Sequence, residues 1–178
     1  MGGTSMTRPS SSTIEPRRCR RAAAVLLLFC LVFGTGAAAG VEPIEPPRDD
    51  RCPVCGMFTA EYPDFAARVT FSDDASFTFD GPKDMFTFLL SLAKYAPGRS
   101  RSGVEQVMVT EYYELIAIDA ETAFFVAGSD VRGPMGAELV PFATREDAEA
   151  FSSDHRGTAV LAFGDIDLDT LRDLGATR

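Results

Sequence analysis

One stretch of the chain passes from the alternation of a β-strand to the spacing of an α-helix: Phe77-Thr78-Phe79-Asp80-Gly81-Pro82-Lys83-Asp84-Met85-Phe86. Phe77 and Phe79 share one face of the expected strand, because successive side chains of a strand point to opposite faces. Asp80-Gly81-Pro82 predicts a helix start, with Asp80 as its cap and Pro82 in its first turn. Residues at helical spacing continue the pattern to Pro97-Gly98: Met85, Phe86, Leu89, Leu90 and Ala93.

Patterns on both sides of this stretch predict an α+β protein with a mostly antiparallel sheet. Further strands are expected over residues 67–71, 107–110, 115–118, 123–126, 139–142 and 159–163. Thr144 is expected to cap a second helix that runs to about Ser153, and a short helix follows over residues 168–174. Phe79 and Phe142 each precede a helix at a similar place, which predicts two related ββαβ-like units.

Residues 1–39 are expected to be a signal peptide rather than part of the fold. Four arginines between residues 17 and 21 precede an apolar run over 22–32, and Ala37-Ala38-Ala39 fits the small-residue rule for cleavage. A retained membrane anchor over 22–39 is the alternative. Lipidation at Cys30 is less favoured, because Phe29 stands where a small residue is needed. Residues 40–51, rich in Pro and charge, predict a flexible tether before a single domain over 52–178.

The charge of the chain argues against one class of function. The sequence has 17 Lys and Arg against 26 Asp and Glu, and five Arg and one Glu lie in the leader. The mature part therefore has 12 basic and 25 acidic residues, a net charge of −13. Nucleic-acid binding by charge attraction is not expected of such a surface. An acidic surface favours solubility, and it also suits contact with a metal cation or a basic partner.

Two thiols and a thioether lie close together in Cys52-Pro53-Val54-Cys55-Gly56-Met57, and the Cys-Pro-Val-Cys-Gly segment predicts a turn. Sulfur at this density indicates either a soft metal such as Cu(I) or thiol–disulfide exchange. A closed zinc site needs four ligands, whereas the mature chain offers one Cys pair and a single His, His155. A thioredoxin-like site needs its Cys pair at a helix N-terminus, but here Gly56 directly follows the pair. Cu(I) needs only two or three soft ligands, and it is the favoured interpretation.

A second thioether is the natural complement of such a site, and Met135 is the best candidate for it. It lies in Gly133-Pro134-Met135-Gly136, a turn rather than an ordinary core position. Met85 and Met108 are expected in the core, because they lie on a helix stripe and in a strand. His155 is expected to end a helix and to interact with its dipole.

Several motifs occur together in one order: Cys55-Gly56-Met57, Phe79-Asp80-Gly81-Pro82-Lys83-Asp84-Met85-Phe86, Val109-Thr110-Glu111-Tyr112-Tyr113, Gly128-Ser129-Asp130-Val131-Arg132-Gly133-Pro134-Met135-Gly136 and Glu138-Leu139-Val140-Pro141-Phe142. This set resembles the NosL family, the copper-binding accessory proteins of nitrous oxide reductase maturation. The resemblance spans nearly all of residues 52–163. It implies a fold of paired ββαβ units, similar to that of organomercurial lyase.

The resemblance also implies a function: a periplasmic, non-enzymatic Cu(I) chaperone for the copper–sulfur centre of the reductase. Its implied partners are the ABC-type transporter complex of the maturation machinery and the apo-reductase, with association at the membrane as a further option. The family's Cys and Met fall on Cys55 and Met135, with Cys52 and Met57 as further sulfur donors nearby. Many members have a His where this chain has Ala137, so the third ligand stays open among Met57, Cys52, solvent and a partner's side chain. The alternative function is a periplasmic thiol–disulfide oxidoreductase that uses Cys52 and Cys55.

Overall fold

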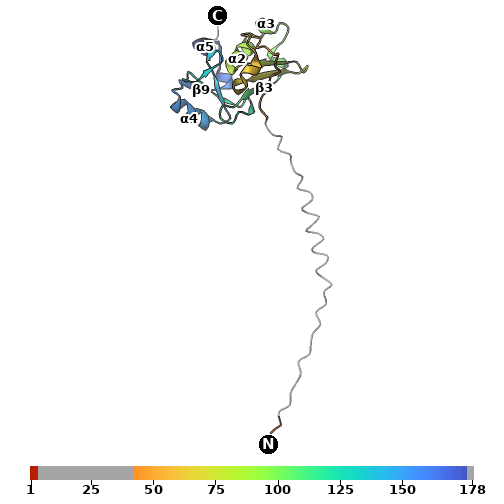
Figure 1. Cartoon of the computed structure of the whole chain (residues 1–178), viewed down its shortest axis with the longest axis vertical. Coiled ribbons are helices and arrows are strands. Elements are labelled where there is room, and N and C mark those ends of the chain that lie inside the picture. Colours follow the sequence, from red (N-terminus) through yellow and green to blue (C-terminus); the bar gives the residue numbers. More distant parts are fainter. Residues whose placement is uncertain (4–41, 176–178) are drawn as a thin grey trace. The chain divides into compact units, whose positions relative to one another are not determined.

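Two antiparallel sheets, one of four strands and one of three, form the framework of the computed structural model, which describes residues 1–3 and 42–175 (Figure 1). The first sheet has the order β2-β1-β3-β4, from the strands β1 (Ala67–Phe71), β2 (Ser76–Phe79), β3 (Val104–Thr110) and β4 (Ala117–Asp119). The second has the order β8-β5-β9, from the strands β5 (Phe124–Ala127), β8 (Val140–Phe142) and β9 (Ala159–Ala162). All pairs within both sheets are antiparallel.

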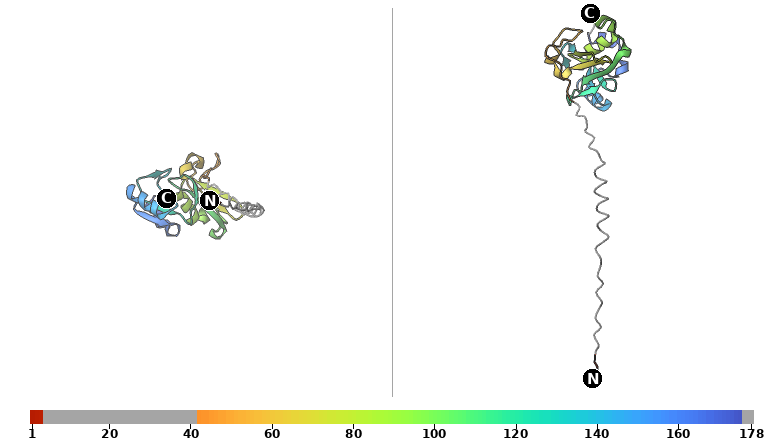
Figure 2. Two further views of the ribbon diagram at one scale, coloured as in Figure 1. Left: turned by 90° about the horizontal axis from the view of Figure 1, so that it is seen from below. Right: turned by 90° about the vertical axis from the view of Figure 1, so that its right-hand side faces the viewer.

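The two expected ββαβ units are confirmed. In the first, the strands β1 and β2 are followed by the helix α2 (Pro82–Leu90) and then by β3. In the second, β5 and β8 are followed by the helix α4 (Arg145–Asp154) and then by β9. In each unit the first strand lies between the other two, so the topology repeats as well as the order. Figure 2 shows both units from two further sides.

Shorter elements complete the described part of the chain. The helices α3 (Leu92–Tyr95) and α5 (Leu168–Asp173) follow the first unit's long helix and the last strand. A hairpin of β6 (Arg132–Gly133) and β7 (Gly136–Ala137) is inserted between β5 and β8. Four 3-10 turns lie at Thr59–Glu61, Pro63–Phe65, Arg101–Gly103 and Phe163–Asp165. No helix among residues 1–3 and 42–175 has the length and apolar character needed to cross a membrane.

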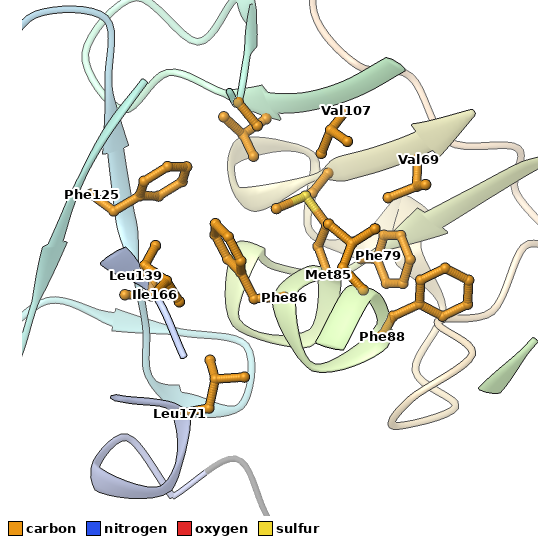
Figure 3. Packing of buried hydrophobic residues seen from close by; sticks show 14 of the residues in the cluster. Val69, Phe79, Met85, Phe86, Phe88, Val107, Phe125, Leu139, Ile166 and Leu171 are labelled. Atoms are coloured by element: carbon orange, nitrogen blue, oxygen red, sulfur yellow. The ribbon is translucent and has the colours of Figure 1, made fainter. Parts of the chain in front are cut away.

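The core lies where α2 faces both sheets. Met85 and Phe86 are adjacent on α2, and Figure 3 shows Met85 directed toward Val107 and Phe86 toward Phe125. The rings of Phe86 and Phe125 meet edge to face, with their centroids 5.1 Å apart. Because Val107 belongs to the first sheet and Phe125 to the second, one helix joins the two units through a shared apolar core.

The start of α2 differs from the sequence prediction in a way that matters for the site. The N-cap is Gly81, which makes no side-chain cap, and Asp80 is therefore not the cap. The expected continuous helix is also interrupted, because Ser91 leaves helical geometry and separates α2 from α3. The predicted cap of the second helix is confirmed, since the hydroxyl of Thr144 accepts a hydrogen bond from the amide of Asp147.

Residues 42–51 belong to the expected tether, and the structure shows them in contact with the first sheet. The side chain of Ile44 is buried beside Ala66 and Ala117. The amide of Ala117 also donates a hydrogen bond to the carbonyl of Glu42, at 3.2 Å. An isoleucine between prolines thus contributes apolar surface to the domain. Apart from its first three residues, the expected signal peptide lies outside the described part of the chain.

Candidate metal centre

A tight loop holds the two cysteines, as the turn predicted for this motif. The amide of Cys52 donates to the carbonyl of Met57, and the amide of Gly56 donates to the carbonyl of Cys52, both at 2.9 Å. Gly56 has φ +81°, a left-handed conformation that favours glycine, and this allows the chain to reverse directly after Cys55. The loop is closed at its base by a bridge between Arg51 and Phe58.

Two carboxylates reach this loop from the start of α2. Asp80 ends the link from β2, and Asp84 lies in the first turn of α2. Asp80 precedes the extended N-cap Gly81, so helical spacing does not relate the two acids, and their hydrogen bonds show that both carboxylates face the cysteine loop. The thiol of Cys52 donates to Oδ2 of Asp84, and the thiol of Cys55 donates to Oδ1 of Asp80, each at 3.3 Å.

These four side chains form what we call the thiol–carboxylate cluster: Cys52, Cys55, Asp80 and Asp84. One donor atom from each lies within 4.8 Å of every other. Cys52, Asp80 and Asp84 are buried, while Cys55 is half-buried and is the member most open to solvent. Neither cysteine forms a disulfide. Two sulfurs and two oxygens that converge in this way can bind a metal cation.

The surroundings of the cluster disfavour negative charge on the thiols. The pKa of Cys55 is raised to about 12, chiefly by burial; the hydrogen bond from the Met57 amide opposes the rise, and the neighbouring carboxylates of Asp84 and Asp80 add to it. Burial also raises the pKa of Cys52 far above its usual range. The pKa of Asp84 is raised as well, again chiefly by burial. The apo site is therefore poor in thiolate at neutral pH.

Met57 and Met135, the two methionines predicted as copper ligands, differ in exposure and in their main-chain contacts. Met57 is half-buried, and its carbonyl helps to close the cysteine loop. Met135 is 49% exposed in the loop of the β6–β7 hairpin, as expected for a methionine in that turn. Its carbonyl accepts a hydrogen bond of 3.0 Å from the ammonium of Lys83, in the first turn of α2. Thus the helix start that carries the carboxylates also binds the hairpin that carries Met135.

Sequence reasoning found the thiols but missed the carboxylates. The Asp80–Asp84 stretch predicts a helix start with Asp80 as its cap, and the spacing of four between its acids does not by itself indicate a site. The expectation of a core position is confirmed for Met85, which is fully buried. Met108, also expected in the core, is only half-buried against the small cluster of Ile44. His155 is the C-cap of α4, where its ring stacks on Phe151.

Fold and site together define an α+β protein of two ββαβ units with a thiol-rich candidate metal centre between a loop and a helix start. The NosL family model matches residues 43–171, and the chain belongs to the NosL family. It is 30% identical over 168 residues to the copper-binding lipoprotein NosL of Stutzerimonas stutzeri, and the match covers 86% of this chain and 85% of that protein. The crystal structure of the copper chaperone NosL from Shewanella denitrificans matches the fold, with a TM-score of 0.60 at 24% identity, over 72% of this chain and 98% of that one.

Proposed function

We propose that this protein is an exported Cu(I) chaperone that binds the ion at Cys55 and Met135, with Cys52 and Met57 as further donors. The proposal rests on one observation: the cysteine loop and the hairpin that carries Met135 are both attached to the start of α2. Asp80 and Asp84 hold the cysteine thiols, and Lys83 between them holds the main chain of Met135. Thiolate and thioether are the ligands that Cu(I) prefers in low coordination.

The carboxylates of the cluster give the site a way to exchange protons for metal. Each thiol already donates a hydrogen bond to a carboxylate, so a proton can leave along an existing contact when the metal enters. Two thiolates and two carboxylates in a largely buried place repel one another, and a cation relieves this repulsion. The apo site is thus stable with its protons, and the loaded site is stable with its metal.

An exposed Met135 and a half-buried Cys55 suit a protein that gives its metal away. An acceptor's ligand can approach from solvent and enter the coordination shell before the donor's ligand leaves. The acceptors that we propose are the ABC-type transporter complex and the apo-form of nitrous oxide reductase, in the periplasm, with the copper–sulfur centre as the destination. The relative named as a lipoprotein supports export, and the signal-like leader of this chain is consistent with it.

The same geometry weighs against the alternative of a thiol–disulfide oxidoreductase. Such enzymes need an attacking thiol with a lowered pKa at a helix N-terminus. Here the cysteines lie in a loop outside any helix, and burial raises the pKa of both. Insulin reduction at the uncatalysed rate by the reduced protein is the expected result, and catalysis that requires both cysteines would support the enzyme instead.

Anaerobic titration of the reduced protein with Cu(I), in competition with a chromogenic chelator, tests the chaperone directly. Cys55→Ser and Met135→Leu are expected to weaken binding, whereas Met108→Leu is the matched control, because Met108 packs in a separate apolar cluster. X-ray absorption of the loaded protein counts the sulfur neighbours of the ion. Failure to bind Cu(I), or wild-type binding by both site variants, would refute the proposal.

A further inference from the structure

The hairpin that carries Met135 has little to hold it in place by itself. Its strands β6 and β7 contain two residues each, and among the described strands they pair only with each other. An isolated two-stranded hairpin is at best marginally stable in water. Pro134 restricts the loop, and Gly136, with φ +91°, reverses it, but neither residue determines where the loop lies relative to the cysteines.

Lys83 provides one attachment from the helix start. Its ammonium donates to the carbonyl of Met135 at 3.0 Å and to the carbonyl of Ala137 at 2.6 Å. These two carbonyls lie on either side of Gly136, so a single side chain binds the loop and the return strand. Lys83 is only 2% exposed, and among the described residues it forms no ion pair within 4.0 Å. Its charge is directed to the hairpin.

Glu138 provides the reverse attachment. It directly follows β7, and its Oε1 accepts hydrogen bonds from the amide of Lys83 at 2.6 Å and from the amide of Leu139 at 2.9 Å. The hairpin end therefore satisfies a free N–H group in the first turn of α2, while the Lys83 side chain satisfies hairpin carbonyls. The two contacts are reciprocal, and both residues are buried.

Two glycines show how closely the segments meet at Glu138. A Cβ atom on Gly81, just before α2, would lie 2.5 Å from Oε2 of Glu138. A Cβ atom on Gly133, in β6, would lie 2.9 Å from Cγ of Glu138. Gly81 has φ −170°, an extended conformation open to any residue. A glycine is therefore needed there because a side chain would not fit, and not because of the backbone conformation. The hairpin and the helix start are packed around one carboxylate.

Stability alone does not explain a buried lysine and a buried glutamate at this point. Removing charged groups from water is costly, and apolar residues of similar volume are often as stabilising or more so. Directed hydrogen bonds do provide orientation, which apolar contacts do not. The groups that they orient are the main chain of Met135 and the helix turn between Asp80 and Asp84.

We propose that Lys83 and Glu138 are positioning residues for copper binding, which place the thioether of Met135 against the thiols of Cys52 and Cys55. This inference rests on the proposed function, because it requires Met135 to be a copper ligand. Neither Lys83 nor Glu138 touches the metal in this scheme. They act through the hairpin, by holding its loop and its return strand on the first turn of α2.

A double-mutant cycle in Cu(I) affinity tests the inference. Lys83→Leu removes the ammonium without adding a thioether that could itself bind Cu(I), and it is expected to weaken binding about tenfold, the same loss that is expected of Met135→Leu. Because both substitutions remove the same ligand, the double variant should bind within about twofold of Met135→Leu alone. X-ray absorption of Lys83→Leu should show fewer sulfur neighbours than the wild type. Lys94→Leu, at an exposed lysine of α3, is the charge control and should bind normally.

Glu138 offers a conservative rescue. Glu138→Gln keeps an oxygen acceptor for the Lys83 amide and should retain affinity within about threefold, whereas Glu138→Leu removes the acceptor and should resemble Lys83→Leu. If Lys83→Leu does not fold, Gly133→Ala disturbs the packing around Glu138 from β6 and should also weaken binding.

Two results would overturn the inference, and they are distinguishable. If Met135→Leu weakens binding while folded Lys83→Leu and Glu138→Leu, or Gly133→Ala in their place, bind like the wild type, the hairpin needs no such support and the proposed function stands. If Met135→Leu itself binds like the wild type, Met135 is not a ligand and the proposed ligand set fails as well. Additive losses in the double variant also contradict positioning, because they indicate a general effect on the domain.

Discussion

The thiol of Cys55 donates a hydrogen bond of 3.3 Å to Oδ1 of Asp80. Asp80, which the sequence predicts as a helix cap, thus accepts a hydrogen bond from a cysteine twenty-five positions away. The N-cap position is occupied by Gly81, which makes no side-chain cap. A carboxylate beside a thiol opposes thiolate formation. A cation removes that opposition, so the pair is suited to binding a metal and ill suited to attacking a disulfide.

Asp80→Asn should make the Cys55 thiol more acidic. Burial is the main cause of its raised pKa, and the negative charge of Asp80 adds to it, so removing that charge lowers the pKa from about 12 while burial stays the same. We expect faster alkylation of Cys55 by iodoacetamide at pH 8, measured by mass spectrometry of the apo-protein. Asp64→Asn, at an exposed aspartate, is the matched control and should leave the rate unchanged. An equal rate in both variants would show that Asp80 does not act on the thiol.

Copper affinity should rise with pH. The pKa of Cys55 is raised to about 12 by burial and by the nearby carboxylates, so the free thiol is protonated at neutral pH and must lose its proton to bind Cu(I). Each proton released strengthens binding about tenfold per pH unit. Chelator competition at pH 6, 7 and 8, corrected for protonation of the chelator, measures the slope. A pH-independent affinity would mean that the thiols bind without losing protons.

Glu138 should make the domain less stable as the pH rises toward neutrality. Burial raises its pKa from 4.5 to about 7, against the opposing effects of the Leu139 amide and of Lys83, so the folded protein keeps a proton that the unfolded chain releases. The contribution of Glu138 to the free energy of unfolding is therefore fully present below pH 4.5 and falls by about 3 kcal/mol as the pH rises to about 7. Asp84 has a raised pKa too, and it contributes in the same direction.

Glu138→Gln has no charge to bury and should flatten this fall. Urea unfolding at pH 5 and pH 8 measures it, and Glu61→Gln, at an exposed glutamate, should keep the wild-type difference between the two pH values. An unchanged difference in Glu138→Gln would indicate that other groups cause the pH dependence.

Phe86→Ala should weaken the contact between the two ββαβ units. Phe86 is 1% exposed, and its ring meets Phe125 of β5 and Phe163 after β9 at centroid distances of 5.1 and 4.9 Å. Removing a buried ring of this kind costs about 3–5 kcal/mol of unfolding free energy. Leu90→Ala on the same helix removes a 43% exposed side chain and should cost far less. Chemical unfolding of both variants measures these costs. Similar losses of unfolding free energy in the two variants would contradict the role of Phe86 in joining the two units.

Much of the fold follows from local patterns that can be recognised in the sequence. Alternation identifies β1 and β2, and Pro82 with its helical stripe identifies α2. The helix cap at Thr144 and the turn at Gly56 can also be predicted from the sequence, because capping and tight turns depend on a few neighbouring residues. The break at Ser91 was not visible, because no local residue requires it.

By itself, the sequence determined that two thiols share a loop and that a thioether lies in a Gly–Pro turn, since such facts depend only on neighbours in the chain. Only the tertiary structure showed that Asp80 and Asp84 face the thiols, and that Lys83 and Glu138 hold the Met135 hairpin. Contacts of this kind join residues separated by 25 to 55 positions. The thiol contacts depend on how the cysteine loop packs on the start of α2, and the contacts of Lys83 and Glu138 depend on how the β6–β7 hairpin packs there. Side-chain spacing along the chain encodes neither packing.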